Sequence, residues 1–405
     1  MNSFLGRSVA ALFVATVLVL PAGLALADAN VRDGIPTLDH VFVIVLENHN
    51  SYTSFGYPGI LESTYAPHIR ALAGKWNVAT NYNGVWHPSL PNYIAMIAGD
   101  FTGTDVTNNG KGVAAGHSYP TNSYVGISDD DSASISVDLA APAGASVHRW
   151  QVNKPSLAGQ LVGHGLEWRA YLQNLPQTGS LVANWPGDSN TAKLYAVKHN
   201  PFPYIAEVQS DPAQLNRQVP LEQLFSDLAD PRKAPAFSYI VPDQCRDMHG
   251  LGSPLAPCTF NASGVANAGY DDPADISRGD DETFWLVNAI TGSPTWRRGR
   301  NALFIVFDEG NGPLTCPNYN PDTQTDTAAS NSVAPGADCY DATKLNDKVV
   351  LIAITNYGVT GVADNTLYSH YSLLKTVEAA FGLPYLGHAA DGTTNTLAPL
   401  LQPRD

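Results

Sequence analysis

The sequence predicts an α/β sandwich built as one domain around a mostly parallel sheet. Two apolar runs, residues 41–46 and 302–307, are too short for helices and rich in β-branched or aromatic residues, which is typical of strands buried on both faces. Segments with helical periodicity alternate with further strand-like runs, and no internal repeat divides the chain. With 405 residues and 44% hydrophobic content, the chain can bury a substantial core.

The chain begins with a predicted secretory signal. Residues 1–27 combine a basic residue near the start, an apolar core at 9–20 and a small-residue cleavage motif that ends at Ala27. An uncleaved membrane anchor is the alternative, but the apolar segment meets Pro21 and is short for a bilayer span. We therefore expect residues 28–405 to be secreted or periplasmic, with no stable membrane insertion.

In the first half of the chain, the elements after the first strand are expected in a simple order. A helix is predicted at 63–73, and an edge strand at 78–82. The next helix is expected to have Ser89 at its N-cap, because Pro91 is tolerated in a first helical turn. Residues 101–148 are rich in Gly, Ser, Asp and Asn. A loop of that length is either functional or poorly ordered, and a lid or a substrate-side rim is the functional role expected here.

The second half continues the alternation of elements. Helices are predicted at 156–164, 221–228, 276–290 and 369–381. Strands are predicted at 166–172, 236–241 and 349–354. A second irregular excursion is expected at 310–343. We see no clear domain boundary.

The charge balance restricts the kind of partner. The chain has 22 Lys and Arg against 37 Asp and Glu, a formal net charge of −15. This argues against nucleic acid and anionic membranes, because nothing supplies the basic stripe that such binding uses. An anionic substrate would need a local attraction, which a metal ion at the site would supply.

Four cysteines lie in the C-terminal half, inside Pro- and Gly-rich segments. In an exported chain an even number suggests two disulfides, and the local pairs Cys245 with Cys258 and Cys316 with Cys339 are favoured among three connectivities. A zinc site made of the four thiolates is the alternative, but it lacks any C-x-x-C pair.

Both buried strands end on two oxygen-bearing side chains. Glu47 and Asn48 follow the first strand, and Asp308 and Glu309 follow the second. Strands can end in polar residues simply because the chain leaves the core. However, ligand groups collect beyond the carboxyl ends of parallel strands, and three carboxylates brought together would repel one another without a cation. We therefore predict one divalent metal ion held by these four residues.

Ser89 is the candidate nucleophile. A serine at a helix N-terminus has backbone N–H groups beside it, which suits attack on a phosphorus atom that carries negative oxygens, and a nearby divalent cation would lower the pKa of its hydroxyl. The alternative is a simple helix cap, since serine is among the commonest caps.

Histidines are the next candidates. His199 and His249 lie in loops with small and polar neighbours, where a ring can give a proton to a leaving oxygen or bind a phosphoryl oxygen. A purely structural role is the alternative for each. His370 precedes the last helix, where it could orient a phosphate or a ligand, or cap the helix. For His87, two residues before Ser89, packing alone is a sufficient role.

Six segments, in this order, resemble a known family. They are LENHNSYTSFGYP, HPSLPNYIAMIAGD, KHNPF, IVPDQCRDMHG, FIVFDEG and SHYSLLKTVEAAFGLP. The chain is similar, from about residue 40 to about 387, to the bacterial phosphoesterase family of secreted acid phosphatases and phospholipases C, within the alkaline phosphatase superfamily. The resemblance implies a three-layer α/β/α fold with a central, mostly parallel sheet.

The same resemblance implies roles for the candidate residues. The metal would be held by Glu47, Asn48, Asp308 and Glu309, Ser89 would be transiently phosphorylated, and His199 and His249 would contact the phosphoryl group or serve the leaving group. These residues would together bind the metal and the phosphoryl group that is transferred.

Asn92 completes a second local similarity. The run from Ser89 to Asn92, Ser-Leu-Pro-Asn, resembles the Thr-x-Pro-Asn nucleophile turn of nucleotide pyrophosphatases, which makes Asn92 a substrate-binding candidate with His370. The sulfatase pattern, with x-Pro-Ser-Arg after the nucleophile, is not matched. Family members often have two aspartates where this chain has Asp308 and Glu309, and the longer side chain could alter the choice of metal.

The reading that these residues favour is a secreted, metal-dependent phosphomonoesterase of the acid phosphatase type, acting on a small phosphorylated substrate. The chain has no room for the extra modules of the large phospholipases C, but a small phospholipase C or another phosphodiesterase stays open. From other classes, the alternatives are an inactive exported protein that binds phosphate or glycans, and a metal-stabilised structural protein. The sequence gives no indication of the oligomeric state.

Overall fold

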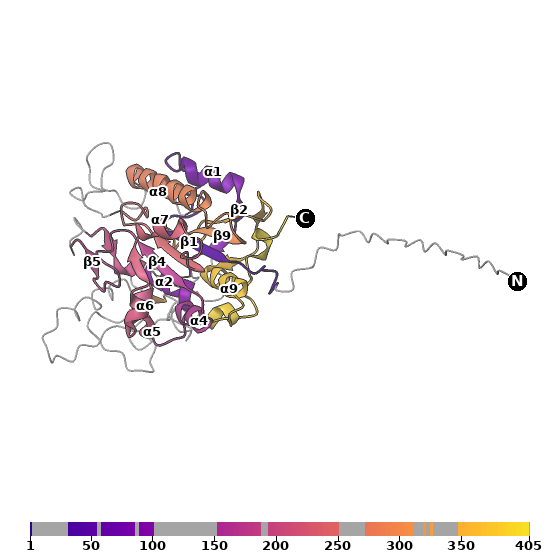
Figure 1. Ribbon diagram of the computed structural model, residues 1–405. Helices are drawn as coiled ribbons and strands as arrows, with labels where there is room; N and C mark the ends of the chain where they lie inside the picture. The colour runs from indigo at the N-terminus through magenta and orange to yellow at the C-terminus, as the bar shows by residue number, and fades with distance from the viewer. Residues whose placement is uncertain are drawn as a thin grey trace.

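An eight-stranded sheet forms the centre of the molecule, in the order β13-β2-β12-β9-β1-β8-β4-β7 (Figure 1). The structure is a computed structural model, and it describes residues 1, 31–54, 58–85, 89–100, 152–187, 193–250, 272–310, 319–320, 325–326 and 347–404.

The middle of the sheet is parallel and buried. β1 (His40–Leu46) lies between β8 (Phe237–Val241) and β9 (Asn301–Phe307), and both pairings are parallel. β4 (Trp168–Leu172) and β7 (Gln218–Pro220) extend the sheet on the β8 side, also in parallel. The paired residues run from His40 with Asn301 to Leu46 with Phe307, so β1 and β9 end side by side. The predicted buried parallel strands are confirmed.

The other side of the sheet differs from the prediction in one respect. β12 (Leu351–Thr355) is antiparallel to β9 and to β2 (Asn77–Ala79), and β13 (Ala363–Asp364) forms the edge beyond β2. The edge strand predicted at 78–82 is therefore wrong in position and length. The chain turns after Ala79, and the next residues form β3 (Tyr82–Asn83), which pairs with β14 (Tyr368–Ser369).

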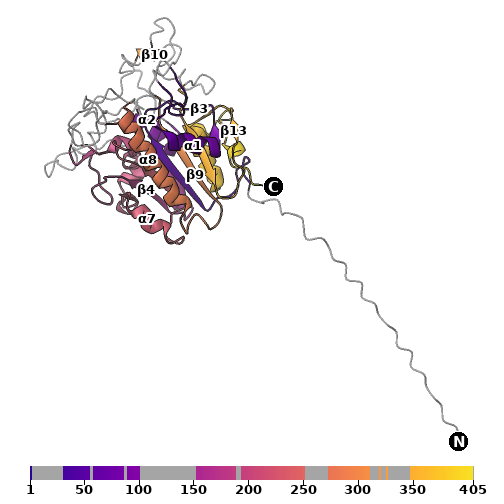
Figure 2. The same cartoon turned by 90° about the horizontal axis from the view of Figure 1, so that it is seen from above.

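Helices cover both faces of the sheet, which confirms the three-layer α/β/α fold (Figures 1 and 2). α1 (Pro67–Lys75) and α8 (Pro273–Thr291) pack together on one face. α2 (Ser89–Ala98), α9 (His370–Ala380) and α4 (Leu157–Gly163) lie on the other. The shorter elements are β5 (Asn184–Trp185), β6 (Tyr195–Ala196), β10 (Tyr319–Asn320), β11 (Thr325–Asp326), α5 (Ala206–Gln209), α6 (Pro212–Leu215), α7 (Gln223–Leu228), η3 (Val197–His199), η4 (Phe202–Tyr204), η5 (Gly387–Ala390) and η6 (Ala398–Leu400).

Helix starts follow from capping side chains. Asp272 accepts a hydrogen bond from the backbone N of Ala274 and begins α8, and Ser156 begins α4 in the same way. α1 begins at Pro67, four residues after the predicted start, because Asp280 of α8 accepts hydrogen bonds from the backbone N atoms of His68 and Ile69 at 2.8 and 2.7 Å. This cap comes from a distant part of the chain.

Several predictions lie outside the described residues. They concern the signal segment apart from Met1, the excursion at 101–148, most of the excursion at 310–343, and His87. Cys245 is the one cysteine in the described part of the chain, and it carries no free thiol there, so the connectivity stays a prediction. No helix in the described segments has both the length and the apolar character needed to cross a membrane.

Candidate active site

The ends of β1 and β9 bring the four predicted metal ligands together. The backbone N of Asp308 donates to the carbonyl of Leu46 at 3.0 Å, and the backbone N of Asn48 donates to Oδ1 of Asp308 at 3.0 Å. The side chains of Glu47, Asn48, Asp308 and Glu309 are all buried. Two segments 260 residues apart thus form one polar cluster at the carboxyl edge of the sheet.

Ser89 lies against this cluster. It is the first residue of α2, and its Oγ donates to Oε2 of Glu47 at 2.9 Å and lies 3.3 Å from Oε1 of Glu309. Every residue of α2 is buried, so the position of Ser89 is set by the packing of the whole helix. A serine hydroxyl in contact with two carboxylates from different strands is the arrangement expected of the nucleophile.

Asn92 lies one helical turn after Ser89. Its Oδ1 accepts a hydrogen bond from the backbone N of Val85 at 2.8 Å, and its Nδ2 lies 3.4 Å from Oε2 of Glu309. The amide therefore ties the start of α2 to the end of β9. Its predicted contact with substrate stays a prediction.

The cluster has the character of a cation site. Burial raises the pKa of Glu47 to about 8, against the opposing charge of Lys198. Burial, and then the charges of Glu47 and Glu309, raises the pKa of Asp308 well above its usual range. Oδ2 of Asp308 is buried without a hydrogen-bond partner in the described structure. A divalent cation would satisfy this oxygen and offset the repulsion, and oxygen donors suit a hard cation, so the residues fit the predicted metal.

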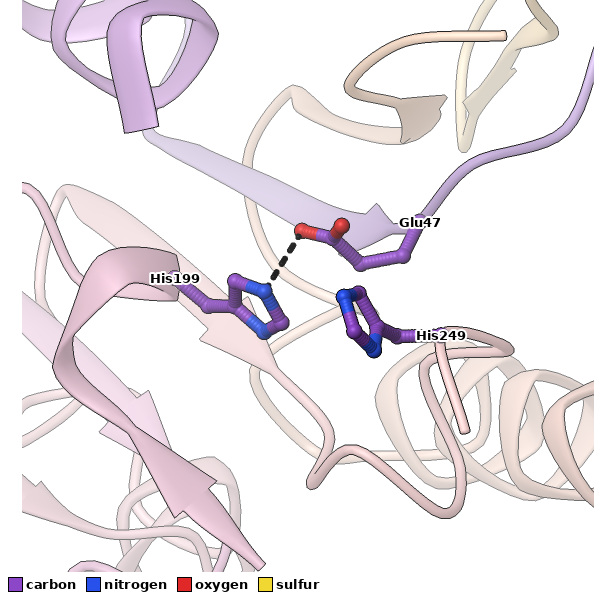
Figure 3. A group of neighbouring side chains, drawn as sticks. All are labelled: Glu47, His199 and His249. Carbon is purple, nitrogen blue, oxygen red and sulfur yellow. Dashed lines mark ion pairs between the residues drawn. The ribbon is translucent and has the colours of Figure 1, made fainter. Parts of the chain in front are cut away.

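His199 approaches Glu47 from η3. Its Nε2 lies 3.3 Å from Oε1 of Glu47, and its Nδ1 lies 3.0 Å from Oδ2 of Asp247 (Figure 3). The ring stacks on Tyr93 of α2, with centroids 5.5 Å apart and an angle of 10° between the planes. A carboxylate on one nitrogen and an aromatic ring on one face fix the orientation of this imidazole.

His249 enters from the loop after β8 and completes a group with His199 and Glu47. One ligand atom from each of these three side chains lies within 4.8 Å of the others (Figure 3). Nδ1 of His249 is 2.7 Å from the carbonyl of Gly250, and Nε2 is 3.1 Å from Nζ of Lys198. Burial, and then the charge of Lys198, lowers the pKa of both histidines well below the usual value, so both rings are neutral at neutral pH.

His370 lies behind Asp308. Its Nε2 is 2.5 Å from the carbonyl oxygen of Asp308, and its Nδ1 is 2.9 Å from the hydroxyl of Tyr82. Burial lowers its pKa to about 4. Nε2 thus contacts the residue that follows β9, and Nδ1 ties the ring to Tyr82 of β3. The predicted substrate contact of His370 remains a prediction.

Four residues of the site were not predicted from the sequence. The hydroxyl of Tyr93 donates to Oε1 of Glu47, Asp247 joins His199 to the backbone N of His249, Lys198 contacts His249, and Asp347 accepts from the backbone N of Gly310. Lys198 and Asp247 lie within two residues of predicted histidines, which is a usable signal. Asp347 has no comparable signal, because its contacts depend on the folded chain.

A small pocket opens beside His199, at the ends of β4 and β8. Its lining residues are Leu172, Gln173, Leu194, Tyr195, Ala196, His199, Val241 and Pro242. Most of these side chains are apolar, so the pocket offers few hydrogen bonds besides those of Gln173 and His199.

Gly310 follows Glu309 in a crowded place, and this leads to a prediction. A Cβ at Gly310 would overlap the side-chain amide of Asn50 and lie 2.5 Å from Oδ1 of Asp347. We expect Gly310→Ala to lower the melting temperature and to reduce phosphoester hydrolysis about 10- to 100-fold by shifting Glu309. The control is Gly74→Ala in α1, where a Cβ meets nothing within 4 Å and stability should rise by up to about 1 kcal/mol. Equal behaviour of the two variants would contradict the prediction.

The raised pKa of Glu47 predicts how cation binding depends on pH. Below about pH 8 the cation-free protein holds a proton on Glu47, which a cation must displace. We expect apparent affinity to rise by about tenfold per pH unit up to this value, with proton release in calorimetry. The pKa is raised on folding, so the stability of the cation-free protein should fall as pH rises from about 4.5 to about 8. An affinity that does not change with pH would contradict this.

Comparison with known proteins identifies a family for this chain. The Phosphoesterase family matches residues 46–384. A phosphatidylinositol-3-phosphatase of Mycobacterium tuberculosis is 23% identical over 358 residues, 88% of this chain and 81% of that protein. An acid phosphatase of Aspergillus fumigatus is 23% identical over 79% of this chain, which spans about half (51%) of its length.

A solved structure adds one more similarity. A phosphonate monoester hydrolase from Silicibacter pomeroyi aligns with 90% of this chain and 76% of its own, at a TM-score of 0.42 and 10% identity. The family match covers most of the sequence and includes every residue of the polar cluster. The chain belongs to the Phosphoesterase family and is a phosphoester hydrolase.

Proposed function

We propose that the protein is an exported, metal-dependent phosphomonoesterase of the acid phosphatase type that works through a phosphoserine intermediate. One observation carries the proposal: the buried hydroxyl of Ser89 lies 2.9 Å from Oε2 of Glu47 and 3.3 Å from Oε1 of Glu309. The acid phosphatases among its relatives support the choice of substrate class.

Each residue of the site would have a distinct role in the transfer of the phosphoryl group. A divalent cation held by Glu47, Asn48, Asp308 and Glu309 would supply positive charge to the phosphoryl oxygens. Ser89 attacks the phosphorus atom in line with the ester oxygen, and its proton faces Oε2 of Glu47. The phosphorus–oxygen bond to the leaving group breaks, the departing oxygen takes up a proton to become the alcohol, and a water molecule then cleaves the phosphoserine to give phosphate and the free Ser89 hydroxyl.

His199 belongs on the same side of the site as Glu47. Its fixed ring, held by Asp247 and Tyr93, is suited to contact the phosphoryl group or the leaving oxygen. Because the buried ring is neutral, one of its two nitrogens has a lone pair; Nδ1 lies 3.0 Å from Oδ2 of Asp247 and Nε2 lies 3.3 Å from Oε1 of Glu47.

Export is proposed from the predicted signal at residues 1–27. The net charge of −15 supports a small, phosphorylated substrate over nucleic acid. A lipid headgroup monoester belongs in the same chemical class, and a phosphatidylinositol-3-phosphatase is among the relatives.

The test is a substrate panel with the purified protein and several divalent cations. We expect phosphate release from nitrophenyl phosphate and from phosphatidylinositol 3-phosphate or another monoester, with little release from bis(nitrophenyl) phosphate. Diacylglycerol production from phosphatidylcholine would instead assign a phospholipase C. Phosphate binding without turnover of any ester would assign an inactive binding protein. Either result would overturn the proposal.

A further inference from the structure

A phosphorylated substrate meets an electrostatic obstacle in this protein. The chain carries a net charge of −15, and four carboxylates of the candidate site are buried: Glu47 and Glu309 contact Ser89, Asp308 lies at the end of β9, and Asp247 lies beside His199. Even with a divalent cation in place, four carboxylates leave little positive charge for a dianionic ester. A fixed positive side chain close to the reaction centre would solve this problem.

Lys198 is such a side chain. It is the residue before His199 in η3, and its Nζ lies 3.1 Å from Nε2 of His249. Its charge is the strongest opposing influence on the pKa of Glu47 after burial, which places the ammonium group in the electric field of the carboxylate cluster. It also lowers the pKa of both histidines, so it acts on every member of the group in Figure 3.

The contacts of His249 do not suit a residue that donates a proton to the leaving oxygen, but they do suit one that holds the ammonium group of Lys198. Its Nδ1 lies 2.7 Å from the carbonyl of Gly250, and a carbonyl can only accept, so Nδ1 carries the proton. Nε2 of the neutral ring therefore has a lone pair, and this lone pair accepts from the ammonium of Lys198. The backbone N of His249 is in turn held by Oδ1 of Asp247 at 2.8 Å.

A continuous series of contacts connects His249 with Ser89. The rings of His249 and His199 have centroids 5.3 Å apart, Nε2 of His199 is 3.3 Å from Oε1 of Glu47, and Oε2 of Glu47 is 2.9 Å from Oγ of Ser89. A hydrogen bond from an ammonium group to a phosphoryl oxygen is charge-assisted, so Lys198 suits an anionic substrate group.

Resting on the proposed phosphoesterase reaction at Ser89, we propose that Lys198 binds a non-bridging oxygen of the substrate's phosphoryl group, and that His249 is the positioning residue that holds the Lys198 ammonium in place. His249 then has no part in protonating the leaving alcohol. This changes the role expected for His249 from the sequence and adds a residue to the substrate site.

The test uses the full mature chain, loaded with its cation, in four variants. Lys198→Met removes the ammonium. His249→Ala removes its support, and His249→Gln keeps a hydrogen-bond acceptor at that place but cannot act as a proton donor of the histidine type. Lys233→Met is the matched control, because Lys233 is exposed in the turn before β8, at the opposite ends of the strands.

We expect Lys198→Met and His249→Ala to lower kcat/KM for nitrophenyl phosphate about 10- to 100-fold, which corresponds to the loss of one charge-assisted hydrogen bond. Inhibition by inorganic phosphate should weaken by a similar factor. His249→Gln should stay within about fivefold of the wild type for nitrophenyl phosphate and equally for phenyl phosphate, whose poorer leaving group needs a proton more. Lys233→Met should match the wild type.

Two results would overturn the inference. One is a His249→Gln variant as impaired as His249→Ala on phenyl phosphate but active on nitrophenyl phosphate, since this pattern identifies a proton donor. The other is a Lys198→Met variant with unchanged phosphate inhibition. Failure of the proposed function is a separate outcome, because it would appear as a lack of ester hydrolysis by the wild type.

Discussion

Replacing Ser89 with alanine is expected to reduce release of phosphate from a monoester by at least about 10³-fold, with divalent cation binding nearly unchanged. The reason is that Oγ of Ser89 is the hydroxyl in contact with Glu47 and Glu309, whereas the four predicted ligands come from β1 and β9 and the residues after them. Steady-state kinetics and calorimetric titration of the cation would measure the two effects separately.

The control for this experiment is Ser210→Ala. Ser210 is exposed, and its hydroxyl donates to the carbonyl of Ala206 in its own helical turn, so activity should not change. In the wild type, rapid acid quenching during turnover should trap phosphate on Ser89, which mass spectrometry would locate. Full activity of the Ser89→Ala variant, or phosphate trapped on another residue, would remove Ser89 from the mechanism.

Replacing Asp308 with asparagine is expected to lower activity without lowering the stability of the cation-free protein. Hydrolysis should fall by about 10²-fold or more, because the cation loses a charged ligand. In the cation-free protein at pH 8, the melting temperature should rise or stay the same. Asparagine has the same shape but no charge, and the pKa of Asp308 is raised by burial and by its neighbours Glu47 and Glu309.

Thermal unfolding with and without chelator, combined with kcat/KM, would test this. The control is Glu222→Gln, since Glu222 is exposed just before α7 and should change neither quantity. A cation-free Asp308→Asn variant that is much less stable than the wild type would show that the carboxylate is stabilising by itself, and that no cation is needed to explain its burial.

The sequence was sufficient to predict those parts of the site that depend on local patterns. β1 and β9 are apolar runs that end on acidic or amide residues, so their burial, their parallel direction and the nearness of Glu47 to Asp308 all follow from strand chemistry. Ser89 could be found because a proline in the first turn marks the start of α2.

Other features depend on contacts between distant segments, which a pattern of nearby residues does not contain. The start of α1 is set by Asp280, more than 200 residues later, and β2 lies inside the sheet because β13 pairs beyond it. In the site, the role of Asp247 becomes visible only when His199 lies 3.0 Å from its carboxylate. Tyr93 could be mistaken for an ordinary core residue, although its hydroxyl donates to Glu47.

The complete burial of α2 has a consequence for how this protein can change. A helix without a solvent-facing side accepts few substitutions, so random mutation of its residues should mostly yield unfolded protein and seldom a new specificity. New substrate preferences are more accessible through the pocket beside His199, where Gln173 and Pro242 belong to segments that follow β4 and β8. Directed evolution should therefore leave α2 untouched and vary the segments that line this pocket.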